Sequence, residues 1–257
     1  MLFTDGNPTR TEDLRIFESN IYEVANVEGI DLDAKLKIAA EEIGDQIMAY
    51  LLQPGSGDPQ AGSRRSLGLS TLVVTPAMRR WHSLHTLALI FRDAFHNQIN
   101  GRYRETWAQY VSAAAEAKQT LFKIGLGFVS NPLARPAKPL VSSGAGLWDR
   151  GLFSVAVAWV DGAGKISAPS EVVTLEVTTG GNPVVAMSGP VPPTATGWIV
   201  YMAEAGGYGD LMQQNTTPVA VGEAWSPLST VLLPGELPVS GQFADIYITA
   251  SRLTPRG

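Results

Sequence analysis

One stretch of helical periodicity, from Thr75 to Phe128, most constrains the fold of this chain. Its apolar residues recur every three or four positions, which places them along one side of a helix. They are Trp81, Leu84, Leu87, Ala88, Phe91, Ala94, Phe95, Ile99, Tyr103, Trp107, Tyr110, Val111, Ala114, Ala117, Leu121 and Ile124. So long an apolar stripe has to be covered by other parts of the chain, so it predicts the centre of a helical domain.

The ends of this stretch carry helix-terminating signals. Thr75 can accept a hydrogen bond from a free backbone N–H group, and Pro76 suits the first helical position because an N–H there has no partner anyway. One helix over the whole stretch would be roughly 75 Å long at ~1.5 Å per residue, too long for a compact domain. We therefore expect a kink or short turn at Asn100-Gly101, and Gly125 with Gly127 to end the second helix.

Two further amphipathic helices are expected upstream. A capping box over 9–12 precedes a first helix over 14–27, which Gly29 ends. Asp31 can cap a second helix over 32–51. With the long stretch, these segments predict a bundle of about four helices.

Two segments of the N-terminal half lack helical periodicity. Residues before Thr9 contain Gly6 and Pro8, so we expect a flexible arm there. Residues 53–70 are rich in Gly, Ser, Pro and Asp and form an unusually long loop for a compact domain. This loop is expected to be disordered or to be ordered by a partner.

After a segment rich in proline and small residues, the periodicity changes from helical to alternating. Strand-like runs separated by turn signals occur at 151–160, 173–177, 184–187, 197–202, 219–221, 231–233 and 246–248. Short strands at such intervals predict an antiparallel β-sandwich. The expected fold class is therefore α+β and multidomain.

Four segments follow from this division. They are an α-helical domain over 1–135, a linker over 136–146, a β-sandwich domain over 147–250 and a C-terminal tail over 251–257. The aromatic residues expected in the two cores are Trp81, Phe91, Phe95, Tyr103, Trp107, Tyr110, Trp159 and Trp198.

Composition excludes several classes of protein. The chain has no cysteine, so disulfide frameworks and thiolate metal sites are impossible. A net charge of −5 argues against a protein that coats nucleic acid with its whole surface. The first residues lack a signal-peptide pattern and no apolar run reaches membrane-spanning length, so we expect assembly in a cytoplasm and no membrane partner.

Local charge differs from the overall balance. Between Arg79 and Arg104 the chain has five arginines and one acid, Asp93. The arginines either form a solvated helix face whose stems cover apolar surface, or contact an acidic partner or passing DNA. Candidate partner or ring-interface residues are Arg64, Arg65, Arg79, Arg80, Arg102, Arg104, Arg252 and Arg256. The tail that carries the last two is either frayed or ordered on a partner.

Patterns that carry chemistry are not found. His82, His85 and His96 lack the HExxH spacing and a following carboxylate ligand. Gly144-Ala145-Gly146 lacks the third glycine of a dinucleotide-binding loop, and there is no serine nucleophile elbow. We therefore expect no enzyme, no catalytic residues, no cofactor and no metal.

Several runs in the first half resemble head-to-tail adaptor (connector) proteins of tailed bacteriophages. They are 28–31 (EGID), 39–43 (AAEEI), 74–82 (VTPAMRRWH), 87–95 (LALIFRDAF), 100–103 (NGRY), 125–129 (GLGFV) and 131–132 (NP). The resemblance implies a structural protein of the virion neck that forms a cyclic homo-oligomer, usually twelve-fold, beneath the portal. It also implies the portal protein and tail or stopper (nozzle) proteins as partners, with DNA passing through the channel without sequence-specific contacts.

The second half is similar to fibronectin type III or immunoglobulin-like modules. The similarity is carried by 153–164 (FSVAVAWVDGAG), 167–171 (SAPSE) and 198–201 (WIVY). Such modules are frequent additions to phage structural proteins. The alternative function is an oligomeric binding module whose β-sandwich recognises a glycan or a protein.

Overall fold

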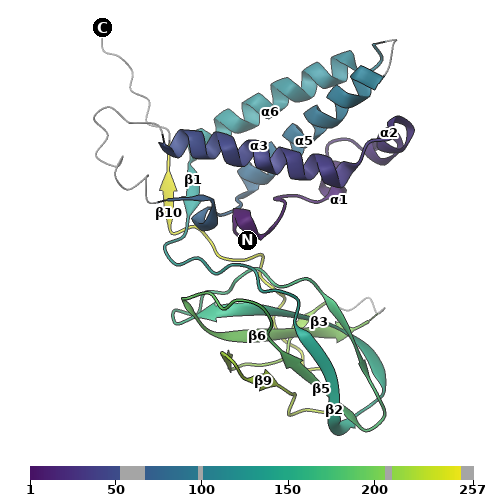
Figure 1. Ribbon diagram of the computed structural model, residues 1–257, viewed down its shortest axis with the longest axis vertical. Coiled ribbons are helices and arrows are strands. Elements are labelled where there is room, and N and C mark those ends of the chain that lie inside the picture. Colours follow the sequence, from purple (N-terminus) through teal and green to yellow (C-terminus); the bar gives the residue numbers. More distant parts are fainter. Residues whose placement is uncertain (53–66, 98–100, 206–209, 250–257) are drawn as a thin grey trace. The chain divides into compact units, whose positions relative to one another are not determined.

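The structure, a computed structural model, describes residues 1–52, 67–97, 101–205 and 210–249. The protein is α+β, with helices first and antiparallel strands after them. It divides into two compact units (Figure 1). The helical unit contains Gly6–Ser130 and the described residues from Ala244 onward, and the β unit contains Met1–Asp5 and Asn131–Phe243.

The helical unit is built around the long apolar stretch. Its described α-helices are α1 (Thr11–Leu14), α2 (Ile21–Glu28), α3 (Leu32–Leu52), α5 (Pro76–Asn97) and α6 (Arg104–Ile124). Helices α5 and α6 form an antiparallel pair, and α3 packs against α5 (Figure 1). Buried residues on the facing sides include Trp81, Leu87, Phe91, Ala114 and Leu121.

Most of the expected helix ends are confirmed. Thr75 Oγ1 accepts a hydrogen bond at 3.3 Å from the backbone N–H three residues later, and Pro76 begins α5. Asp31 caps α3 in the same way at 3.1 Å, and Gly29 ends α2 in the left-handed region with a φ of 65°. A break between helices is found where it was predicted, because α5 ends at Asn97, α6 begins at Arg104 and Gly101 has a φ of 65°. Asn100, the other residue of the predicted break, lies outside the described residues.

The expected first helix is wrong in its middle, because residues 15–20 separate α1 from α2. The Tyr110 hydroxyl donates a hydrogen bond to the Phe17 carbonyl at 3.2 Å, so this carbonyl has a tertiary partner. The expected cap at Thr9 is wrong as well. Asp13 Oδ2 accepts from the Arg10 N–H at 2.8 Å, whereas the Thr9 hydroxyl is used in a buried contact with α5.

A small sheet closes the helical unit. Strand β1 (Leu126–Phe128) pairs antiparallel with β10 (Ile246–Ile248), and Gly127 lies opposite Tyr247. On the other edge of β1, the N–H of Val73 donates to the Gly127 carbonyl at 2.9 Å. A Cβ atom on Gly127 would lie 2.7 Å from the Ala244 Cβ, so only glycine fits this close approach.

The β unit contains two antiparallel sheets. The first consists of β2 (Leu140–Trp148), β5 (Gly181–Ala186) and β9 (Ala224–Trp225) in that order. The second has the order β4 (Val173–Val177), β3 (Gly151–Asp161), β6 (Ala195–Glu204) and β7 (Met212–Gln213), and β8 (Val219–Ala220) also pairs with β6.

Several expected boundaries are wrong. The predicted linker over 136–146 overlaps β2, whose small residues pair with β5. The expected strand at 231–233 is not one, and residues 246–248 form a strand of the helical unit. Residues 1–5 are no free arm, because Leu2 is 1% exposed in the β unit. These errors share one cause: local pattern shows that a segment is extended or polar, but not which segment it pairs with.

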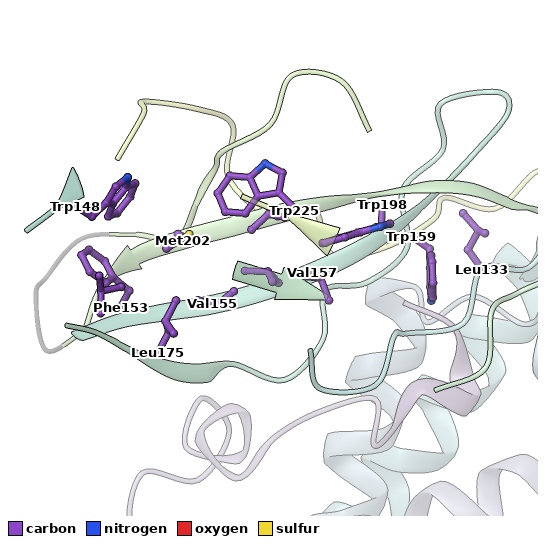
Figure 2. Packing of buried hydrophobic residues seen from close by; sticks show 13 residues of the cluster. Leu133, Trp148, Phe153, Val155, Val157, Trp159, Leu175, Trp198, Met202 and Trp225 are labelled. Carbon is purple, nitrogen blue, oxygen red and sulfur yellow. The ribbon is translucent and has the colours of Figure 1, made fainter. Parts of the chain in front are cut away.

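The two sheets of the β unit share one hydrophobic core (Figure 2). Phe153, Val155, Val157 and Trp159 alternate along β3 into this core, as their spacing predicts. The first sheet contributes Trp148, Val185 and Trp225. The opposite side of β3 and β6 is buried too, through Ala156, Ala158, Val160, Ile199 and Tyr201.

Six of the aromatic residues expected in the cores are buried. They are Trp81, Phe91, Tyr103, Tyr110, Trp159 and Trp198. Phe95 and Trp107 are only partly buried, and their rings stack with centroids 5.5 Å apart. The middle of the predicted stripe, near the end of α5 and the start of α6, therefore contains an aromatic pair that remains partly open to solvent.

Strand β10 should stabilise the helical unit although it follows the β unit in sequence. We expect residues 6–130, joined by a short Gly-Ser linker to 244–249, to be more stable than 6–130 alone. The gain should be about 2–4 kcal/mol, because β10 adds backbone hydrogen bonds and buries Ile248. Chemical denaturation measures it. A control in which Gly-Ser residues replace 244–249 should show no gain, and equal stability of both linked chains would contradict the role of β10.

Candidate functional site

Those predicted arginines that the structure describes do not form one patch. Arg79 and Arg80 are exposed near the start of α5, whereas Arg102 and Arg104 are exposed beyond its end. Helix α5 has 22 residues, which span roughly 33 Å, and the two pairs lie near its start and beyond its end. The other candidates, Arg64, Arg65, Arg252 and Arg256, lie outside the described residues.

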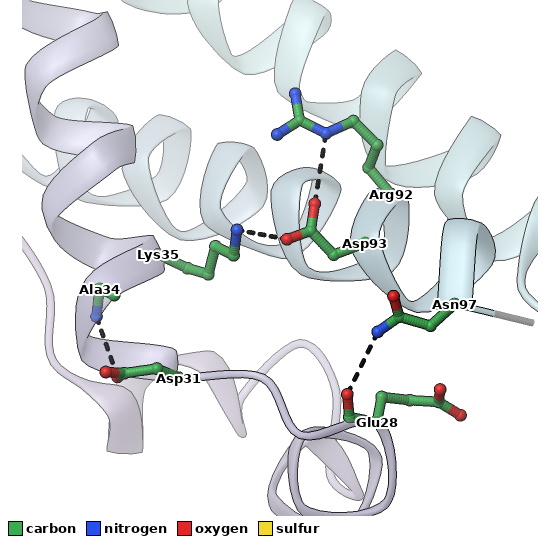
Figure 3. A network of polar contacts seen from close by, with 7 residues as sticks. All are labelled: Glu28, Asp31, Ala34, Lys35, Arg92, Asp93 and Asn97. Atoms are coloured by element: carbon green, nitrogen blue, oxygen red, sulfur yellow. Dashed lines mark hydrogen bonds and ion pairs between the residues drawn. The ribbon is translucent and has the colours of Figure 1, made fainter.

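The middle of the arginine-rich run belongs to a polar network between helices (Figure 3). Asp93 of α5 forms an ion pair with Lys35 of α3 and accepts a hydrogen bond from Arg92 Nε at 3.5 Å. Near the end of α5, Asn97 Nδ2 donates to the Glu28 carbonyl of α2 at 3.2 Å. Asp93, the one acid of this run, therefore helps to hold α3 against α5.

A hollow of about 390 Å³ opens between α3, α5 and α6, and we call it the first hollow. Its walls are Trp81, Ala88, Leu89, Trp107, Val111, Ala114 and Ala115, with Glu42, Gln46, His85, Arg92 and Lys118 as polar members. His85 Nε2 lies 2.6 Å from Glu42 Oε2, and Lys118 Nζ donates to Gln46 Oε1 at 2.7 Å. These polar groups therefore already have partners in the fold. Val111, whose side chain is 48% exposed, is an accessible apolar residue of this hollow.

A second hollow of about 350 Å³ lies between α5 and α6. It is lined by Pro76, Ala77, Arg80, Glu116, Ala117, Thr120 and Ile124. At 3.6 residues per turn, Ile124 lies roughly 140° around α6 from Val111. Ile124 is 56% exposed, so the helical unit presents accessible apolar side chains in two different directions.

The described side chains do not form a metal site. Among them, no group of three or more His, Asp or Glu residues could hold an ion. The histidines are dispersed: His82 is buried, His85 pairs with Glu42, and His96 lies beside Phe95 with ring centroids 5.3 Å apart. Within the described part of the chain, each helix is too short or too polar to cross a bilayer.

In the β unit, a hollow of about 530 Å³ is lined by amides and hydroxyls beside Trp225. Its two amide side chains are already occupied. Asn215 Oδ1 accepts from the Val200 N–H at 2.7 Å and its Nδ2 donates to two carbonyls. Gln214 exchanges hydrogen bonds with Leu233, at 2.9 Å from the backbone N–H and 3.1 Å to the carbonyl. These amides fix the backbone, so they are not free to bind a sugar.

Comparison of the sequence with protein-family models gives no match, and comparison with curated proteins gives none either. The resemblance to phage adaptors therefore depends on the sequence runs alone and stays a prediction. What the structure adds is geometry: two apolar hollows on the helical unit and separated arginine pairs at either end of α5. Sequence reasoning did not find either hollow, because each is formed by residues from more than one helix.

A buried histidine joins three parts of the helical unit. His82 is fully buried, with Nε2 lying 3.0 Å from the Leu36 carbonyl and Nδ1 lying 2.6 Å from the Thr9 hydroxyl. In its neutral form, Nε2–H can donate to the carbonyl while Nδ1 accepts from the hydroxyl. Burial lowers the pKa of His82 to about 4, against the opposing effect of the Leu36 hydrogen bond.

His82 should make the helical unit less stable in mild acid. The unfolded chain, with a His pKa of 6.5, binds more protons than the folded chain between pH 6.5 and about 4. Its contribution is complete above pH 6.5 and is lost as the pH falls, by about 2 kcal/mol from pH 7 to 5. Denaturation of His82→Gln should show a pH dependence smaller by this amount, whereas the exposed control His96→Gln should match wild type. Identical pH dependence in His82→Gln and wild type would contradict the assignment.

Proposed function

We propose that this protein is a structural adaptor at the head-to-tail junction of a tailed bacteriophage. In this proposal the helical unit forms a closed ring beneath the portal, through which DNA passes without sequence-specific contacts. The β unit is a β-sandwich of the immunoglobulin or fibronectin type III class carried by the ring. The protein has a mechanical role and no enzymatic one, and the completed ring belongs to the virion neck.

The observation that carries this proposal is the pair of hollows on the helical unit. A closed ring needs head-to-tail contacts, so each protomer must present two different and complementary surfaces. The first hollow presents Val111 beside a mixed-charge rim, and the second presents Ile124 beside Arg80 and Glu116. Because they face different directions around α6, one protomer can use both at once.

The chain order gives further support. Adaptors of the resembled family hold on to portals with terminal segments, and here β10 returns the C-terminal end of the chain to the helical unit. The exposed Arg79 and Arg80 suit an acidic partner surface. For the β unit, two antiparallel sheets that share one core support the sandwich class. The twelve-fold protomer number is implied by the resemblance alone.

The ring contact can be tested by breaking each surface separately. Val111→Asp and Ile124→Asp replace exposed side chains, so both variants should fold, and each should fail to form rings in mass photometry. A head-to-tail ring makes a further demand. Each variant retains the surface that the other lacks, so a mixture should form a heterodimer that cannot grow further.

The matched control is Leu147→Asp, which changes an 83% exposed apolar residue of the β unit. It should form rings like wild type. A symmetric dimer that loses assembly in either variant and is not restored by mixing would contradict the head-to-tail contact. A wild-type chain that stays monomeric, ignores the portal ring of the same phage and binds a glycan would instead favour the binding-module alternative.

Portal binding should depend on the charge at the start of α5. The double variant Arg79→Glu and Arg80→Glu should bind a portal ring at least about tenfold more weakly, because a rim charge that faced an acidic surface would now repel it. Arg150→Glu changes an arginine whose side chain is 74% exposed in the β unit and serves as the control. Biolayer interferometry at low and moderate salt measures both. Equal affinities would show that Arg79 and Arg80 belong to a solvated helix face.

A further inference from the structure

The β unit contains a hollow of about 300 Å³ with an unusual polar composition. Three prolines, Pro136, Pro190 and Pro192, contribute to its wall. Asp5, Arg135 and Trp159 bring the polar groups. Since proline has no backbone N–H, much of this wall offers apolar CH₂ surface and no donor.

Two donors at this hollow have no acceptor. Trp159 is 1% exposed, and its Nε1 has no hydrogen-bond partner among the described residues. The same holds for Arg135 Nε, which is also buried. Figure 2 shows Trp159 at one end of the core cluster beside Leu133, with its nitrogen directed away from the other core side chains. Buried donors without partners are rare in native proteins, because burial removes their hydrogen bonds to water and nothing replaces them.

Two other tryptophans of this core, Trp198 and Trp148, have acceptors for their indole N–H groups. Trp198 Nε1 donates to the Ala220 carbonyl at 3.2 Å, and Trp148 Nε1 donates to the Ser229 carbonyl at 2.5 Å. In both cases the β unit supplies the acceptor from its own backbone. At Trp159 the described residues of the β unit supply none, which leaves the indole N–H available to an acceptor from a molecule seated in the hollow.

The charges at the hollow decide which kind of acceptor fits. Asp5 Oδ1 accepts from the Arg135 backbone N–H and Asp5 Oδ2 accepts from the Leu2 N–H, each at 2.7 Å. Asp5 and Arg135 both line the hollow, so it contains one carboxylate and one guanidinium. With no net positive charge, the hollow favours a neutral acceptor over an anion.

We propose that this hollow binds an extended peptide segment of a partner protein through one of its backbone carbonyls. The carbonyl oxygen has two lone pairs and can accept from Trp159 Nε1–H and Arg135 Nε–H together. A small apolar side chain of the same segment packs against the three prolines. The residues around Arg135 and Pro190 are in no described strand, so the segment can dock without displacing a sheet hydrogen bond.

The indole N–H signal of Trp159 in full-length protein tests this site. The chain has six tryptophans, and Trp159→Phe identifies the signal because it removes one indole N–H while keeping an aromatic ring. The probe is acetyl-tetraalanine amide, which is neutral, extended and rich in carbonyls. Titration followed by ¹H–¹⁵N NMR should move the Trp159 signal downfield and saturably, and leave those of Trp198 and Trp148 in place.

Two variants complete the test. Arg135→Ala should weaken the peptide about tenfold or more, as expected for loss of a charged hydrogen bond, and the exposed control Arg150→Ala should bind like wild type. Both keep Trp159, so the test stands even if Trp159→Phe fails to fold. A Trp159 signal that does not respond to peptide would overturn the proposal, because a water molecule would then be its acceptor. Tighter binding of acetate than of the blocked peptide would overturn the assignment to a neutral carbonyl.

Discussion

The pairing of β1 with β10 is the interaction on which the organisation of this chain depends. It joins residues 126–128 to 246–248, so the segment Asn131–Phe243 of the β unit lies in the sequence between two parts of the helical unit. Closing so long a loop is tolerable because its entropic cost grows only with the logarithm of loop length. The small sheet also fixes Gly127 against Ala244, where no larger residue fits. The helical unit is therefore complete only after the C-terminal part of the chain has returned.

The buried polar side chains differ in whether their hydrogen-bonding atoms all have partners within the fold. His82, Asn215 and Gln214 are buried, and each has partners that hold backbone from another segment. Trp159 and Arg135 are the exceptions, since one buried nitrogen of each has no partner among the described residues. A buried polar group whose hydrogen bonds are complete holds parts of the fold together, whereas an incomplete one at a hollow is the basis of the binding site that we propose.

Much of the helical half could be predicted from sequence. The caps at Thr75 and Asp31, the end at Gly29 and the break between α5 and α6 at Gly101 all depend on interactions within a few residues, which local sequence specifies. Thr9 shows the limit. Its hydroxyl suits a helix cap, but in the structure this hydroxyl lies in hydrogen-bond contact with the buried His82 of α5 instead. The sequence showed an excess of arginine between Arg79 and Arg104. It did not show that these arginines are separated by the length of α5, with Arg79 near its start and Arg102 beyond its end.

By itself, the sequence determined that helices precede strands, where the chain divides into helical and β halves to within several residues, and six of the aromatic residues that are buried in the two cores. Periodicity and capping act over three or four residues, so they can be read without knowing the fold. The tertiary structure decided that β2 lies where a linker was expected, that 246–248 pairs with β1, and that β3 and β6 are buried on both faces. It alone formed the hollows. Each of these features depends on partners far apart in the chain, and no local pattern specifies such a partner.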